Sequence, residues 1–210
     1  MLKYGSQSIS DDDISAVVSV LRSEMLTQGP VVNSFERKFA EFVGANDAIA
    51  VNSATSALHL AYLALGLSPG DLLWTSPNTF VATTNAAIMC GADVDFVDVD
   101  QNTGNLSVEL LEHKLNSALK SGKLPKIVVP VHFSGLPCDM EQISKLGEKF
   151  GFKVVEDASH ATGAKYTVNA DSSLVGDCKY SDATVFSFHP VKLITTGEGG
   201  MITTNNNKIA

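Results

Sequence analysis

The chain has 210 residues, of which 44% are hydrophobic and 18% charged, as in ordinary globular proteins with a sizeable core. Its 15 Lys and Arg against 23 Asp and Glu give a formal net charge of −8, and no basic cluster interleaved with aromatics is present, which argues against nucleic-acid binding. No apolar run approaches the roughly 20 residues needed to span a membrane. Cys90, Cys138 and Cys178 form no CxxC pair and no even disulfide set, and no signal peptide is recognisable, so we expect a cytoplasmic protein.

Two helices are predicted before the first strand. The first, residues 10–26, has Ser10 as its N-cap, three aspartates in its first turn and apolar residues on one face. Three successive aspartates on a helix point in different directions, so we interpret them as a helix start and expect no metal site. The second helix follows a Gln-Gly-Pro turn, and its Phe35, Phe39 and Phe42 recur at helical spacing, which predicts core positions.

From residue 48 onward, predicted strands alternate with predicted helices. Short apolar or β-branched runs predict seven strands, near residues 48, 73, 95, 128, 154, 184 and 201. The segment 165–180 is rich in Asn, Asp, Ser and Gly, and we interpret it as a surface excursion. This alternation predicts a doubly wound α/β domain with a mostly parallel sheet.

Candidate functional side chains follow the predicted strands at one end. Five candidates come directly after a predicted strand: Asn52 to Thr55, Phe80, His132, Asp157 and Ser187. Open parallel sheets bind ligands at the carboxyl edge of their strands. We therefore expect these residues to gather in one site.

Several of the candidate residues also have a purely structural interpretation. Ser53 to Ser56 opens a helix whose free N–H groups and hydroxyls could bind a phosphate, but the same residues could be a plain helix cap. Taken alone, Phe80 could be a core residue. Asp157 could cap a loop, and His160 could be a satisfied surface histidine.

A polar, glycine-punctuated run from Ser187 to Gly200 lies between the last two predicted strands and contains Lys192. Most loop lysines are simply solvated, but a desolvated amine beside polar groups can lose its proton and attack a carbonyl. Ser187, His189, Lys192, two threonines and Gly-Glu-Gly-Gly stand at a spacing that resembles the lysine loop of the sugar aminotransferases that use pyridoxal phosphate, the DegT family. Further motifs of that family recur upstream in the same order.

The resemblance implies a fold and a set of site residues. The fold is the large domain of fold-type I pyridoxal-phosphate enzymes over residues 1–210, with a seven-stranded sheet, an antiparallel last strand, and the smaller C-terminal domain missing. Lys192 would be the catalytic residue and hold pyridoxal 5′-phosphate covalently. The other cofactor-binding residues would be Ala54, Thr55, Ser56 and Ser187 for the phosphate, and Phe80, Asp157 and His160 for the ring.

The resemblance also implies a reaction. Gln28, Gly29 and His189 would lie on the substrate side. Within the family, the segments 26–30, 52–58, 157–161 and 185–192 are most similar to the transaminases of pseudaminic acid synthesis. These aminate the 4-keto group of a UDP-linked 4-keto-6-deoxy-N-acetyl sugar, and we expect glutamate as the amino donor and a homodimer as the assembly.

Two other functions stay open. A sugar dehydratase of the same family would use the same cofactor, but such enzymes carry histidine in place of Lys192, which disfavours this interpretation. The chain could also be a non-catalytic fragment that binds nucleotide sugars. A Rossmann dehydrogenase is disfavoured because no G-x-G-x-x-G follows the first predicted strand.

Overall fold

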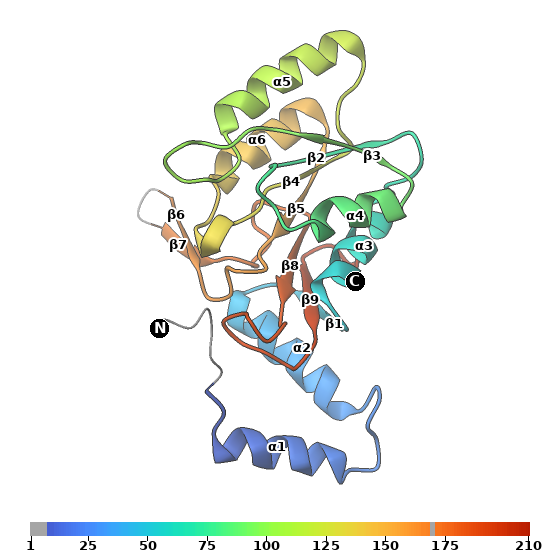
Figure 1. Cartoon of the computed structure of the whole chain (residues 1–210), viewed down its shortest axis with the longest axis vertical. Helices are drawn as coiled ribbons and strands as arrows, with labels where there is room; N and C mark the ends of the chain where they lie inside the picture. The colour runs from blue at the N-terminus through green and yellow to red at the C-terminus, as the bar shows by residue number, and fades with distance from the viewer. Residues whose placement is uncertain (1–7, 169–170) are drawn as a thin grey trace.

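A seven-stranded sheet runs through the centre of the computed structural model, which describes residues 8–168 and 171–210 (Figure 1). Its strands are β1 (Asp47–Val51), β2 (Leu72–Thr75), β3 (Asp93–Phe96), β4 (Ile127–Val129), β5 (Lys153–Asp157), β8 (Ala183–Ser187) and β9 (Gly200–Thr204). Their order across the sheet is β1-β9-β8-β5-β4-β2-β3. β9 lies antiparallel between β1 and β8, and every other pairing in this sheet is parallel. The predicted fold class, the seven strands and the antiparallel last strand are confirmed.

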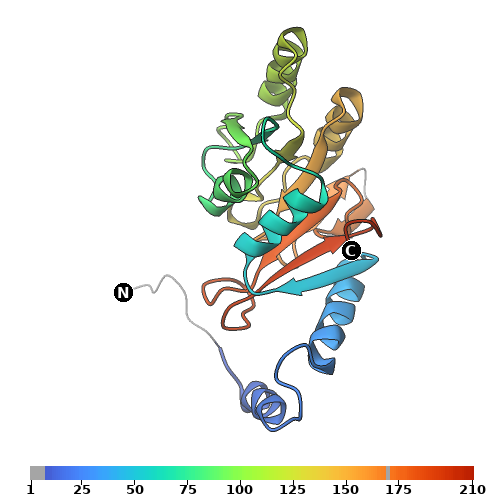
Figure 2. The same ribbon diagram turned by 90° about the vertical axis from the view of Figure 1, so that its right-hand side faces the viewer.

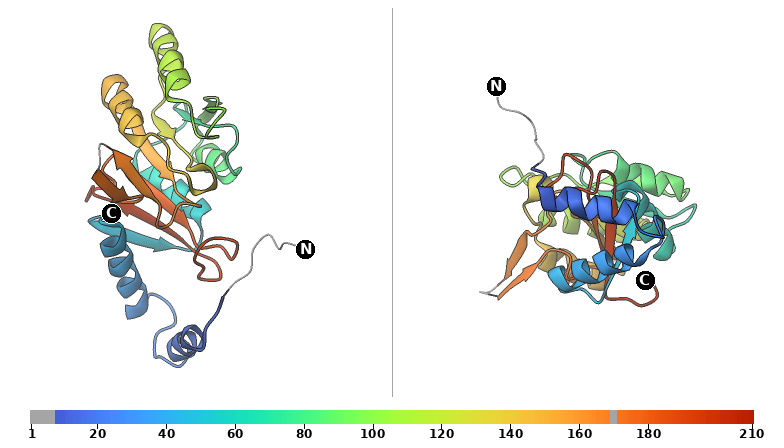
Figure 3. Two further views of the ribbon diagram at one scale, coloured as in Figure 1. Left: turned by 90° about the vertical axis from the view of Figure 1, so that its left-hand side faces the viewer. Right: turned by 90° about the horizontal axis from the view of Figure 1, so that it is seen from below.

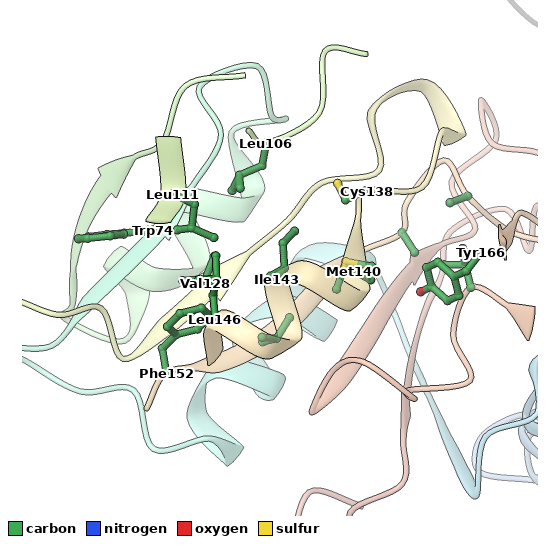
Figure 4. Packing of buried hydrophobic residues seen from close by; sticks show 14 of the residues in the cluster. Trp74, Leu106, Leu111, Val128, Cys138, Met140, Ile143, Leu146, Phe152 and Tyr166 are labelled. Atoms are coloured by element: carbon green, nitrogen blue, oxygen red, sulfur yellow. The ribbon is translucent and has the colours of Figure 1, made fainter. Parts of the chain in front are cut away.

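Helices cover both faces of the sheet (Figure 2). They are α2 (Pro30–Val43), α3 (Ala54–Ala64), α4 (Ala82–Met89), α5 (Val108–Ser121) and α6 (Met140–Phe150), and a further helix, α1 (Asp11–Leu21), precedes them in the chain. Adjacent strand residues face opposite sides, so Leu73 packs in the cluster with α3 and α4, and Trp74 in the cluster with α2, α5 and α6. Figure 4 shows Trp74 and Val128 of the sheet with Leu111 of α5 and Ile143 of α6. Because apolar side chains are buried on both faces of the sheet, the fold is doubly wound. None of the helices in the described residues is long and apolar enough to cross a membrane.

Helix α2 follows local sequence rules at both ends. Pro30 occupies the first turn, and Gly44 ends the helix with a positive φ of 85°. Phe39 is buried and Phe35 packs against the same core cluster, as predicted. Phe42 is 52% exposed, which corrects the prediction that all three phenylalanines lie in the core.

Helix α1 stands away from the sheet (Figures 2 and 3). Ser10 forms the predicted N-cap and exchanges hydrogen bonds with Asp13. The helix ends at Leu21, earlier than the predicted end at Leu26. After it, the Ser23 hydroxyl bonds to the backbone carbonyls of Val20 and Met25, which competes with further helical hydrogen bonds. No residue of α1 is buried, so its apolar face is exposed.

The segment 165–180 contains a β-hairpin that its composition did not predict. β6 (Lys165–Val168) and β7 (Asp171–Leu174) form an antiparallel hairpin beside the main sheet. Tyr166 is only 5% exposed, and its hydroxyl donates a hydrogen bond to the buried Glu156 of β5. The hairpin is therefore anchored by a tertiary contact that a composition rich in turn formers does not signal.

Candidate active site

The carboxyl ends of β1, β2, β4, β5 and β8 converge on one cavity of about 440 Å³. Each of these strands contributes one candidate to the cavity wall, either its last residue or a residue that follows it. They are Thr55, Phe80, His132, Asp157 and Ser187. The expectation that the strand-end candidates gather at one edge is confirmed for these residues, whereas Asn52, also among the candidates, does not line the cavity. A larger groove of about 820 Å³ lies at the amino ends of α5 and α6, and none of the predicted site residues lines it.

One end of the cavity is formed by the start of α3. The Ser53 hydroxyl accepts a hydrogen bond from the Ser56 N–H at 3.2 Å and caps the helix. Ala54 and Thr55 line the cavity, and N–H groups in a first helical turn have no intrahelical acceptor, so they are available to an anion. Gly200 packs against this turn so closely that a Cβ there would lie 2.5 Å from the Ser53 carbonyl carbon. Gly200, at the end of the lysine loop (residues 187–200), therefore lets β9 lie directly against this anion-binding turn.

Asp157 ends β5 at the base of the cavity and is 4% exposed. Its Oδ1 accepts two hydrogen bonds from Ser159, from the N–H at 3.1 Å and from the hydroxyl at 2.6 Å. Its Oδ2 accepts one from the Thr83 hydroxyl at 2.7 Å. Because an ionised carboxylate can accept about four hydrogen bonds, Oδ2 retains capacity for one more donor.

Lys192 lies on the cavity wall next to His160. Its Nζ donates a hydrogen bond to His160 Nε2 at 2.6 Å. Burial lowers the pKa of the Lys192 amine, and the charge of Asp157 only partly opposes this shift. Burial and the positive charge of Lys192 lower the pKa of His160, with Asp157 opposing, which favours the neutral imidazole, whose Nε2 can accept the hydrogen bond from Lys192. The pair places an amine of reduced basicity beside a neutral hydrogen-bond acceptor.

A second polar cluster lies behind the cavity wall. Glu156 is fully buried and accepts hydrogen bonds from His132 Nε2 at 2.9 Å, Ser181 at 2.5 Å, Thr184 at 2.9 Å and Tyr166. Burial opposes its ionisation, but the hydrogen bonds from its partners outweigh burial and lower its pKa. The cluster holds His132, which the sequence singled out, in the wall of the cavity.

Comparison with known proteins identifies the family of the chain. Residues 7–210 match the DegT/DnrJ/EryC1/StrS aminotransferase family. The chain belongs to this family. It is 44% identical, over its whole length and 53% of the relative, to a Campylobacter jejuni protein named UDP-4-amino-4,6-dideoxy-N-acetyl-beta-L-altrosamine transaminase.

Solved structures show the same likeness. Helicobacter pylori PseC, an aminotransferase involved in the biosynthesis of pseudoaminic acid, superposes with a TM-score of 0.88 at 34% identity, over 99% of this chain and 53% of PseC. A Streptococcus pneumoniae chain described as a PLP-form superposes with a TM-score of 0.82 at 28% identity, over 97% of this chain and 53% of that one. The chain thus spans about half the length of the relatives it matches.

The cavity of this DegT-family chain fits pyridoxal phosphate. The α3 amino end offers N–H groups for a phosphate, Oδ2 of Asp157 has one acceptor position left for a ring N–H, and Lys192 carries an amine of lowered pKa. These three features lie in the wall of the same cavity. The N–H groups, the carboxylate and the amine therefore match, in that order, the phosphate, the ring nitrogen and the aldehyde of that cofactor.

The other predicted site residues lie at different depths. Phe80 is in the cavity wall but 75% exposed, so it forms the rim. Ser56 is engaged in the helix cap and does not line the cavity. His189 lines it with its Nε2 3.9 Å from a Glu198 carboxylate oxygen. Gln28 and Gly29 precede α2 and are not part of the cavity wall.

Three residues that the sequence did not assign contribute to the site. Thr83 and Ser159 hold the Asp157 carboxylate, and Glu156 holds His132. Ser159 could have been found from its spacing two residues after Asp157, which is typical of an Asx turn. No local signal connects Thr83 to Asp157, because 74 residues separate them.

Proposed function

We propose that residues 1–210 are the cofactor-binding large domain of a pyridoxal-phosphate-dependent nucleotide-sugar aminotransferase. The observation that carries the proposal is the hydrogen-bonded pair of Lys192 and His160 in a cavity that also holds Asp157. The reaction transfers an amino group from glutamate to the 4-keto carbon of a UDP-linked 4-keto-6-deoxy-N-acetyl sugar. The names of the Campylobacter and Helicobacter relatives support this substrate class.

Pyridoxal phosphate, when bound, supplies an electron-withdrawing ring that stabilises negative charge on a carbon next to the reacting nitrogen. The start of α3, with Ala54, Thr55 and Ser56, and Ser187 at the end of β8 would hold its phosphate. The Asp157 carboxylate would pair with the ring N–H and so favour a protonated ring nitrogen.

Lys192 and His160 would handle protons. The lowered pKa of Lys192 leaves a larger share of its Nζ unprotonated near neutral pH, as an amine must be to attack an aldehyde. The same nitrogen would remove the proton from the donor's α-carbon and deliver one to the sugar C4. His160, neutral and within hydrogen-bond distance, orients that amine. Phe80 at the rim would cover one face of the ring.

The substrate side and the assembly are further parts of the proposal. His189 lies at the cavity wall, and Gln28 and Gly29 would reach the sugar from the loop before α2. Exposed apolar side chains on α3 and α4, Leu60, Leu63, Ile88 and Met89, give a face for a second copy of the chain in a homodimer. A cytoplasmic location remains a prediction from the sequence.

Covalent trapping tests the proposal. The protein is incubated with pyridoxal phosphate, reduced with borohydride, and mapped by peptide mass spectrometry. We expect the adduct on Lys192, its loss in Lys192→Ala, and its retention in Lys145→Ala, which removes an exposed lysine outside the cavity. An adduct on another lysine, or none, would remove the aminotransferase assignment.

The half-length match favours a second candidate, a non-catalytic domain that binds the cofactor or a nucleotide sugar. Catalysis needs substrate held to within a fraction of an ångström, and the groups that do so in the relatives can lie in the half that this chain does not match. Glutamate-dependent amination of a UDP-keto sugar is measured with this chain and with one extended to the natural stop codon. Activity only in the longer chain would mean that these 210 residues bind the cofactor but do not catalyse the reaction by themselves. Equal activity would show that these 210 residues suffice for catalysis.

A further inference from the structure

We infer that Thr83 is a positioning residue that orients the Asp157 carboxylate toward a protonated ring nitrogen. The inference rests on the proposed function and deepens it. Thr83 lies in the first turn of α4 and is fully buried, and its hydroxyl donates to Asp157 Oδ2 at 2.7 Å. A hydrogen bond to a charged group, formed out of contact with water, is stronger than one between neutral groups.

The direction of this hydrogen bond is determined by its neighbours. Thr79 Oγ1 lies 2.7 Å from Thr83 Oγ1. Each hydroxyl has one proton, and the Thr83 proton points to the Asp157 carboxylate, which can only accept. The Thr79 hydroxyl must therefore donate to Thr83, so the bonds run in one direction from Thr79 through Thr83 to Asp157. Such a chain polarises each hydroxyl and strengthens the last bond.

The two carboxylate oxygens of Asp157 have different tasks. Oδ1 accepts both of its hydrogen bonds from Ser159, two residues along the chain. Oδ2 accepts only the Thr83 bond within the described residues and keeps one acceptor position for a ligand. Thr83 therefore holds the oxygen that a ring N–H would meet, whereas Ser159 holds the other.

Two hydrogen bonds fix the backbone of Thr83. Its N–H donates to the Phe80 carbonyl at 3.1 Å, and its carbonyl accepts from the Tyr62 hydroxyl of α3 at 3.2 Å. The residue thus connects the loop that carries Phe80 to the carboxylate of Asp157. A fixed backbone is what a positioning hydroxyl requires.

The test compares pyridoxal phosphate with its 1-deaza analogue, in which a carbon replaces the ring nitrogen. Both have the same aldehyde and phosphate, so the ratio of their dissociation constants isolates the interaction at the ring nitrogen. The ratio is measured for the unchanged protein and for Thr83→Val, Thr83→Ser, Thr79→Val and Thr84→Val. Thr84 is the matched control, since it follows Thr83 in α4 and its hydroxyl, among the residues that the structure describes, bonds only to the Val81 carbonyl.

We expect the unchanged protein to prefer pyridoxal phosphate and Thr83→Val to reduce that preference about tenfold, the loss typical of a hydrogen bond to a charged group. Thr83→Ser keeps the hydroxyl and restores the preference. Thr84→Val leaves it unchanged. Thr79→Val, which removes only the first donor, reduces it about twofold to threefold and provides the test if Thr83→Val fails to fold.

Four outcomes would overturn the inference. If Thr83→Val weakens both ligands equally, Thr83 only shapes the cavity. If Thr83→Val or, where that variant does not fold, Thr79→Val keeps the full preference, the hydroxyl chain does not act on the ring nitrogen. If the unchanged protein binds both ligands equally through Lys192, the proposed cofactor stands but Asp157 is not its ring partner. Binding of neither ligand to Lys192 refutes the proposed function, and this inference with it.

Discussion

Gly200→Ala tests whether the lysine loop and the anion-binding turn are in direct contact. The new Cβ would lie 2.5 Å from the Ser53 carbonyl carbon and 2.6 Å from the Ala54 nitrogen, whereas ordinary contact begins at 3.4 Å. The separation between the start of β9 and the start of α3 must therefore increase by about 0.9 Å to reach ordinary contact. These neighbours are backbone atoms and cannot rotate away, so we expect an overpacking cost of about 1–3 kcal/mol in the free energy of unfolding.

The same movement separates β9 from the start of α3 and disturbs the predicted phosphate site. Loss of one charge-assisted hydrogen bond, about 1.5–3 kcal/mol, lowers cofactor affinity by about tenfold or more. Urea unfolding measures the stability, and titration with pyridoxal phosphate measures the affinity.

Gly197→Ala is the matched control in the same loop. Gly197 has a positive φ of 82° but no atom within 4 Å of a Cβ, so alanine adds a conformational cost of about 1–2 kcal/mol and no clash. We expect a loss of stability with unchanged affinity. A Gly200→Ala protein that unfolds at the urea concentration of the unchanged protein and binds cofactor equally well would refute the close contact.

Three further predictions concern charged groups. Asp157→Asn, in the chain extended to the natural stop codon, lowers turnover far more than stability, because an amide cannot keep a ring nitrogen protonated; equal turnover would mean that another residue meets the nitrogen. Lys192→Met raises the pKa of His160 in NMR titration, since the positive charge of Lys192 lowers it; an unmoved titration contradicts the contact. Glu156→Gln lowers the free energy of unfolding by about 3 kcal/mol at neutral pH. The pKa of Glu156 is lowered by folding, so its contribution is present above the ordinary pKa of 4.5 and is lost as the pH falls through the folded value. The difference between the two proteins should therefore shrink in urea unfolding as the pH is lowered further below 4.5, and a constant difference would refute an ionised Glu156.

The sequence by itself determined the local elements and the principal candidates of the site. Ser10 marks a helix start because its hydroxyl bonds within one turn, and short apolar or β-branched runs predict strands because a sheet covered by helices is buried on both faces. Lys192, Asp157 and Thr55 could be selected because each stands in a run whose spacing resembles a family motif. Such signals extend over a few residues and need no knowledge of distant segments.

Only the tertiary structure decided the contacts between distant segments. It inserted β9 between β1 and β8, placed Tyr166 of an unpredicted hairpin against Glu156, and brought Thr83 to Asp157. Hydrogen bonds between side chains far apart in the chain form when strands and helices pack, and hydrophobic periodicity carries no information about which polar groups will then meet. The sequence therefore indicated which residues could do the chemistry, while the packing of the elements decided which residues hold them in place.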